Sequence, residues 1–134
     1  MRILVLDDDP DRHKAFQRNL YNHEVVSVLT YDAFIEAVTE QNRFDLAFLD
    51  RDLNMFEAKS LGPVDSMYGE VPRELTGEDV VVWLLNDCPS EKMPMSFHVH
   101  SWNPDPAIRM ESRLRAAGHS VTRFPFHEKM GLDI

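Results

Sequence analysis

Two short apolar runs in this chain each end abruptly in carboxylates. The run ILVL at residues 3–6 is followed by three aspartates at residues 7–9, and the run LAFL at residues 46–49 is followed by Asp50 and Asp52. A continuous apolar run of this length is typical of a strand buried on both faces of a parallel sheet. Because the carboxyl ends of parallel strands share one edge, the pattern predicts an α/β sheet whose acidic side chains meet there.

Apolar runs alternate with amphipathic stretches along the rest of the chain, which is typical of α/β proteins. We expect strands at residues 2–6, 24–29, 46–49, 96–100 and 120–124. Capping residues and prolines mark the starts of about four helices, which begin near residues 10, 31 and 77 and, for the last, span residues 104–117. The length of 134 residues suits one domain, so we expect a single domain over residues 1–134.

Residues 54–75 interrupt this alternation. They mix Gly62, Gly69 and Pro72 with apolar residues such as Phe56. Loops longer than about 12–15 residues are uncommon and are often functional. Because the segment follows the acidic end of the third strand, we interpret it as an inserted loop, either a lid over the site or a tolerated surface insertion.

The charge and cysteine content exclude several classes of protein. The net charge is −9 and the pI is about 5.0, which argues against bulk nucleic-acid binding and against attraction to anionic membranes. Cys88 is the single cysteine, so no intramolecular disulfide or Cys-rich zinc site is possible. The first apolar run is too short for a secretory or membrane-spanning segment, and we expect a cytoplasmic location.

The acidic strand ends are the first candidate site. Carboxylates gathered in this way repel one another and are stabilised by a divalent cation or by a cationic side chain. Magnesium binds through one or two carboxylates and keeps waters that a phosphate can displace. We therefore expect Asp7, Asp8 and Asp50 to hold Mg²⁺ or Mn²⁺. The alternative is that these aspartates are strand-end turn residues, with Asp9 as a helix cap.

The sequence His100-Ser101-Trp102-Asn103, at the end of a predicted strand, is the second candidate site. A histidine there can act as a general acid or base near neutral pH, and the hydroxyl, amide and free N–H groups that follow can bind phosphate oxygens. Strand alternation places His98 on the same side as His100, so the two imidazoles could face one zinc ion. Without a cysteine cluster, however, a zinc site is poorly supported. The alternative is a structural histidine followed by a plain helix cap.

On these motifs the chain resembles the receiver domains of two-component signalling. ILVLDDD resembles their first strand, and FDLAFLDRDL resembles their third strand with Asp50 at the phospho-acceptor position. Two departures argue against phosphorelay signalling: His100 replaces a Thr or Ser, and Phe124 replaces the Lys that precedes a proline. The acidic cluster thereby lacks one cation that would balance its carboxylates.

The departures fit a derived branch, the cyclic-phosphate-processing receiver-like domains. The chain resembles them in LDDDP-x-R at residues 6–12, LD-x-DL at residues 49–53, Thr76-Gly77, and the His-Ser-x-Asn strand end. The resemblance implies a flavodoxin/receiver-like three-layer sandwich. Its five-stranded parallel sheet would have the order 2-1-3-4-5, with an insertion after strand 3.

The resemblance also implies metal-dependent hydrolysis of a cyclic phosphate, on a small phosphoester such as a cyclic nucleotide or on an RNA end. The implied catalytic residues are His100, Asp50 and Asp52, and the implied phosphate-binding residues are Arg51, Ser101 and Asn103. Arg51 stands where the family pattern LDHDL has a histidine. Two functional alternatives stay open: an inactive receiver-like protein-binding module and a phosphorylatable receiver with unusual switch residues. For assembly, Phe124 and Phe126 either form a homodimer interface or belong to the core.

Overall fold

The computed structural model describes residues 1–50, 63–66, 69–72, 75–101 and 104–131. Five parallel strands form one sheet in the order β2-β1-β3-β6-β7. The strands are β1 (Arg2–Leu6), β2 (Glu24–Val28), β3 (Leu46–Asp50), β6 (Ser96–His100) and β7 (Ser120–Arg123). The predicted order 2-1-3-4-5 is confirmed, and each strand ends within one residue of its predicted end.

Four α-helices connect these strands, and their starts carry the predicted caps. They are α1 (Pro10–Asn19), α2 (Tyr31–Glu40), α4 (Gly77–Asn86) and α5 (Pro104–Ala116). The side chains of Asp9 and Thr30 accept hydrogen bonds from backbone N–H groups of the first turns of α1 and α2, and Thr76 forms a capping box with Asp79. Gly118, with a φ of +93°, follows α5 in the left-handed conformation that glycine adopts without strain.

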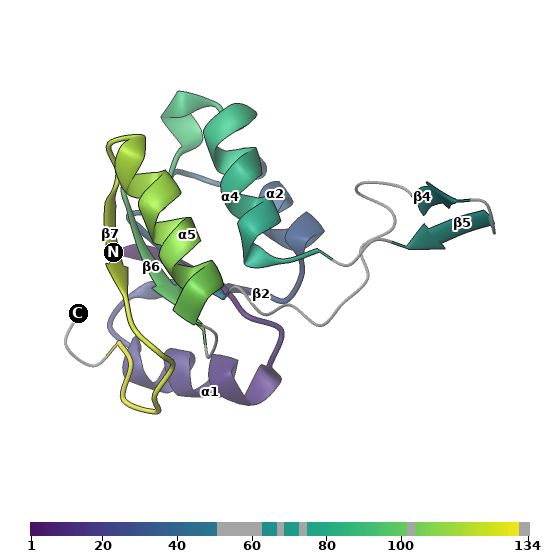
Figure 1. Ribbon diagram of the computed structural model, residues 1–134. Coiled ribbons are helices and arrows are strands. Elements are labelled where there is room, and N and C mark those ends of the chain that lie inside the picture. The colour runs from purple at the N-terminus through teal and green to yellow at the C-terminus, as the bar shows by residue number, and fades with distance from the viewer. Residues whose placement is uncertain (51–62, 67–68, 73–74, 102–103, 132–134) are drawn as a thin grey trace.

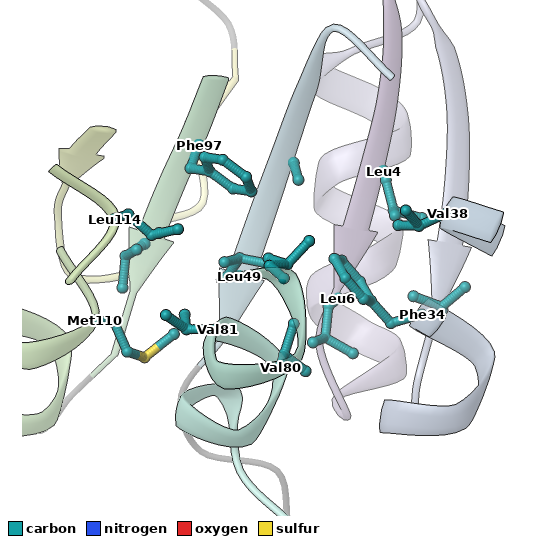
Figure 2. Packing of buried hydrophobic residues seen from close by; sticks show 14 of the residues in the cluster. Leu4, Leu6, Phe34, Val38, Leu49, Val80, Val81, Phe97, Met110 and Leu114 are labelled. Atoms are coloured by element: carbon teal, nitrogen blue, oxygen red, sulfur yellow. The ribbon is translucent and has the colours of Figure 1, made fainter. Parts of the chain in front are cut away.

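Helices α2, α4 and α5 cover one face of the sheet, and α1 lies on the other (Figure 1). Figure 2 shows the larger core beneath the three helices, where residues of alternate strand positions meet the helices. Its members include Leu4, Leu6, Phe34, Leu49, Val80, Val81, Phe97, Met110 and Leu114. Burying a leucine or phenylalanine side chain contributes roughly 1.5–3 kcal/mol, so this core is a principal source of stability.

A smaller core lies between α1 and the opposite face of the sheet. Its members are Ile3, Val5, Phe16, Leu20, Phe48 and Met130. Met130 belongs to the segment that follows β7, and this segment is extended or turned, without a helix, over residues 124–131. The α1 face is therefore covered by one helix and an irregular segment, whereas the other face is covered by three helices.

The inserted segment contains an antiparallel hairpin of β4 (Pro63–Ser66) and β5 (Gly69–Pro72), where the sequence predicted only a loop. Its role as a lid and the single domain over residues 1–134 stay predictions. None of the helices in the described part of the chain combines the length and the hydropathy that crossing a bilayer requires.

Candidate functional site

Three rows of side chains on the α1 face end in polar residues at the carboxyl edge of the sheet. Because strand side chains alternate between faces, Asp7, Asp50 and His100 continue the rows that Val5, Phe48 and His98 begin. Asp50 and His100 are register partners on β3 and β6, and Asp7 directly follows the pair of Leu6 with Leu49. All three polar residues are buried, at 0%, 2% and 1% exposure. The topology thus gathers them from distant parts of the chain.

Asp7 is the most heavily hydrogen-bonded member of this group. Its carboxylate accepts bonds from the Arg12 guanidinium at 2.8–3.0 Å, from the backbone N–H of Asp9 at 2.9 Å and from Nε2 of His100 at 2.9 Å. Burial opposes ionisation of Asp7, but the bonds from His100 and Arg12 outweigh it and hold the pKa of the carboxyl below its usual value. Asp7 is therefore an ionised, fully engaged carboxylate at neutral pH.

His100 is buried between Asp7 and aromatic rings, with the ring of Phe16 at 5.7 Å. Burial lowers the pKa of His100 below its ordinary value, although the bond to Asp7 opposes this shift. The imidazole is then neutral at pH 7, and because Asp7 can only accept, Nε2 carries the proton. Nδ1 is left with a lone pair, and it has no hydrogen-bond partner among the residues that the structure describes. This tautomer makes Nδ1 a potential proton acceptor.

Arg12 is a member of the site that the sequence reasoning did not single out. Its guanidinium also lies 3.3 Å from Asp50 and 3.6 Å from Asp8, and it stacks over the ring of Phe126 at 5.5 Å. Burial opposes its charge, but hydrogen bonding to Asp7 outweighs this and raises the pKa of the guanidinium. The lysine of receiver domains is replaced by Phe124, as the sequence indicated, and Arg12 supplies a different balancing cation from the first turn of α1.

The position of Arg12 follows from the cap of α1. Pro10 occupies the first turn and Asp9 caps it, so the third helical residue faces back toward the end of β1. The motif LDDDP-x-R carried this information, since an arginine five residues after Asp7 reaches it over one helical turn. His13, from the same turn, hydrogen-bonds the backbone carbonyl of Asp7 through Nε2 at 2.6 Å. Both residues fix the strand end against α1.

The carboxylates and the imidazole at this edge form a donor set of the kind that binds a divalent cation. Single ligand atoms of Asp7, Asp50 and His100 lie within 4.8 Å of one another. Both oxygens of Asp7 are already engaged by Arg12 and His100, and Arg12 also contacts Asp8 and Asp50. The carboxylate oxygens of Asp8 and Asp50 are the hard ligands that a divalent ion prefers. The residues present therefore fit such an ion, with Asp8 and Asp50 better suited than Asp7.

Several residues that the sequence predicted for the site do not belong to the group of Asp7, Asp50 and His100 in the described structure. Arg51, Asp52 and Asn103 lie outside the described residues. Ser101 is buried directly after β6, and its position in the alternation places it opposite His100. Phe126 packs beside Arg12 and Phe16, whereas Phe124 is 53% exposed.

Comparisons with known proteins agree with this geometry. The family model described as "Cyclic-phosphate processing Receiver domain" matches residues 2–116. Among solved structures, a CheY-like response regulator receiver domain from Methanospirillum hungatei JF-1 is similar with a TM-score of 0.62 at 16% identity, covering 98% of this chain and 87% of that chain. A response regulator from Thermotoga maritima has a TM-score of 0.59 at 14% identity, covering 98% and 91%. These two show the fold alone. No curated protein matches the chain in sequence.

Proposed function

The chain belongs to the cyclic-phosphate processing receiver domain family, and from this premise we propose that it hydrolyses a cyclic phosphate ester with the help of a divalent metal ion. The substrate class is a cyclic nucleotide or an RNA end that carries a cyclic phosphate. The observation that supports the proposal most directly is the buried pair of Asp7 and His100 beside Asp50, at the edge where α/β sheets bind ligands.

Asp8 and Asp50 are the residues that would hold the ion, Mg²⁺ or Mn²⁺. Both carboxylates lie beside Asp7 and Arg12, and they offer the hard oxygen ligands that an ion of this class prefers. By the family resemblance, Asp52 would add its backbone carbonyl. When bound, the ion supplies Lewis-acid chemistry that neutralises phosphate charge and favours attack by water.

His100 is the residue to which we assign proton transfer. In the hydrolysis of a cyclic phosphate, water forms a new bond to phosphorus and one phosphorus–oxygen bond to the sugar breaks. Nδ1 of His100 accepts the proton of the water and then donates it to the departing sugar oxygen, which becomes a hydroxyl. Asp7 orients the ring through Nε2 and stabilises the imidazolium that forms in between.

Binding of the phosphoryl oxygens is assigned to Arg51, Ser101 and Asn103, since a guanidinium, a hydroxyl and an amide all donate hydrogen bonds to phosphate. His100 is only 1% exposed, so the edge above it has to open before a substrate can reach the ring. Movement of a covering segment during turnover is common in enzymes that exclude water from the reaction.

The test is hydrolysis of a panel of 2′,3′- and 3′,5′-cyclic nucleotides with Mg²⁺ or Mn²⁺. We expect turnover by the wild-type protein and a loss of roughly 10²–10⁴ in rate for His100→Ala, the usual contribution of a general acid or base. His98→Gln, two residues earlier on the same strand, is the matched control and should keep the rate. Full turnover by His100→Ala, or no turnover of any substrate by the folded wild-type protein, would contradict the proposal.

The alternative is a receiver-like module without catalytic activity that binds a protein. One observation favours it: Arg12 already balances part of the acidic cluster without a metal. Titration of Mg²⁺ or Mn²⁺ followed by intrinsic tryptophan fluorescence and calorimetry separates the two. A flat titration together with an inactive substrate panel favours the binding module, whereas saturable metal binding favours the hydrolase.

A further inference from the structure

A pocket of about 600 Å³ opens on the α1 face of the sheet, away from the acidic edge. It lies over β3, β6 and β7, where only the irregular segment after β7 covers the sheet. Pockets of roughly 300–1,000 Å³ are the size that small-molecule ligands occupy. None of the residues assigned to the hydrolytic site lines it.

The wall of the pocket is held in place by side-chain contacts. The amide of Asn19, on α1, donates hydrogen bonds to the carbonyls of Glu128 and Met130 at 2.7 and 2.9 Å. Met130 is buried, and Gly131 has a φ of +97° with Leu20 only 2.9 Å from the place of a Cβ atom. A residue other than glycine would be strained here. The wall is thus preformed, which lowers the entropic cost of binding a ligand.

The floor of the pocket is a row of aromatic rings from β3, β6 and the residue that follows β7. The ring of His98 lies 4.9 Å from that of Phe48 and 5.4 Å from that of Phe124, with interplanar angles of 39° and 30°. Thr122 fixes the imidazole through a 2.9 Å hydrogen bond between its hydroxyl and Nδ1. Phe124 is 53% exposed, a large apolar surface for a strand end. A flat aromatic group would bury this surface by stacking.

The rim of the pocket carries one lysine. Lys129 lines it together with the imidazole of His127, and among the residues that the structure describes no aspartate or glutamate does. Lys129 is exposed and forms no ion pair with any described residue, on a chain whose net charge is −9. An unpaired cation beside an apolar floor favours a ligand with an anionic group at one end.

We propose that this pocket binds a small aromatic compound that carries one acid group. The ring stacks on His98 and Phe124, beside the fully buried ring of Phe48, and the carboxylate or other acid group pairs with Lys129. The site is separate from the hydrolytic one, so the proposal stands or fails independently of the proposed function.

The experiment uses three probes with one ring system and different charges: indole-3-acetate, indole-3-acetamide and tryptamine. Each is titrated into the ¹⁵N-labelled full chain and followed by NMR. We expect saturable shifts of the amides of Phe48, His98 and Thr122 with indole-3-acetate, about tenfold weaker binding of the neutral amide, and no binding of the cation. A tenfold difference corresponds to about 1.4 kcal/mol, the order expected for one partly desolvated ion pair.

Two variants test the residues. Lys129→Glu should weaken binding of indole-3-acetate at least tenfold, whereas Lys14→Glu, an exposed lysine on α1 with the same change of charge, should not. Phe124→Ala should weaken all ring binding, and because Phe124 is exposed the fold should persist. Equal binding of the three probes, shifts outside the pocket, or a concentration-dependent dimer that buries these amides in place of the probe would each overturn the proposal.

Discussion

At the scale of single residues, the site is organised around the charge on Asp7. One carboxylate accepts bonds from Arg12 and His100 at once, so the same group anchors a permanent cation and selects the tautomer of a neutral imidazole. Each bond depends on the ionised state of Asp7, which Arg12 stabilises. Arg12 therefore determines both the stability of the metal-free site and its remaining negative charge.

Replacement of Arg12 by methionine tests this role. The change leaves a buried carboxylate without its main partner, so we expect the free energy of unfolding in EDTA to fall by about 3 kcal/mol, typical of a broken buried pair. We also expect tighter binding of Mg²⁺ or Mn²⁺, because the guanidinium no longer competes for Asp8 and Asp50. Urea denaturation and calorimetric titration measure the two effects.

The control for that variant is Arg109→Gln, which removes an exposed ion pair with Glu78. Solvent and salt screen exposed pairs so that they contribute little net free energy, and the stability and metal affinity of this variant should stay close to wild type. Unchanged stability of Arg12→Met in EDTA, or weaker metal binding, would show that Arg12 does not act as the internal counter-ion.

At the scale of helices and strands, local signals made most of the fold predictable. Strand periodicity placed β1 and β3, and the caps at Asp9, Thr30 and Thr76 placed three helix starts, because these signals act over a few residues. The proximity of Asp7 and Asp50 could also be predicted, because both follow strands that were expected to be parallel neighbours in the sheet. The contact of Arg12 with Asp7 could not be predicted in the same way, because a long side chain has many rotamers and only tertiary packing selects one.

The capping box of α4 gives an element-scale prediction. The hydroxyl of Thr76 accepts a bond from the N–H of Glu78, and Asp79 accepts one from the N–H of Thr76. Thr76→Ala should lower the free energy of unfolding by about 1 kcal/mol. Thr39→Ala, in the last turn of α2, is the matched control and should change it by less than about 0.5 kcal/mol. Equal effects in urea denaturation would show that the cap contributes nothing specific.

At the scale of the whole molecule, the two faces of the sheet differ in the elements that cover them and in where polar residues and a pocket lie. Three helices bury the larger core, whereas the α1 face carries the buried polar group at one end and the apolar pocket at the other. The described residues after β7 contain no helix, in agreement with the helices that the sequence predicted. The sequence did not predict that this segment turns back onto α1, because the hydrogen bonds from Asn19 join residues far apart in the chain.

Burial of His100 and Asp7 predicts how the stability of the whole fold depends on pH. The folded-state pKa of His100 lies below its ordinary value of 6.5, and that of Asp7 lies below its ordinary value of 3.8. At a pH near or below each ordinary value, the unfolded chain therefore binds more protons than the folded chain. The free energy of unfolding should therefore decrease as the pH falls below about 6.5, and again below about 3.8. One proton changes it by at most about 1.4 kcal/mol per pH unit.

The first of these decreases is assigned to His100, and one substitution separates it from the general effect of acid. Urea denaturation in EDTA between pH 7.5 and 5 should show a decline in the wild-type protein that His100→Gln removes, because glutamine has no proton to gain in this range. His127→Gln, which replaces an exposed histidine, should keep the decline. A decline of the same slope in His100→Gln, or a wild-type protein that becomes more stable on acidification, would mean that the imidazole is not held neutral by burial and that its Nδ1 is not the proton acceptor proposed for hydrolysis.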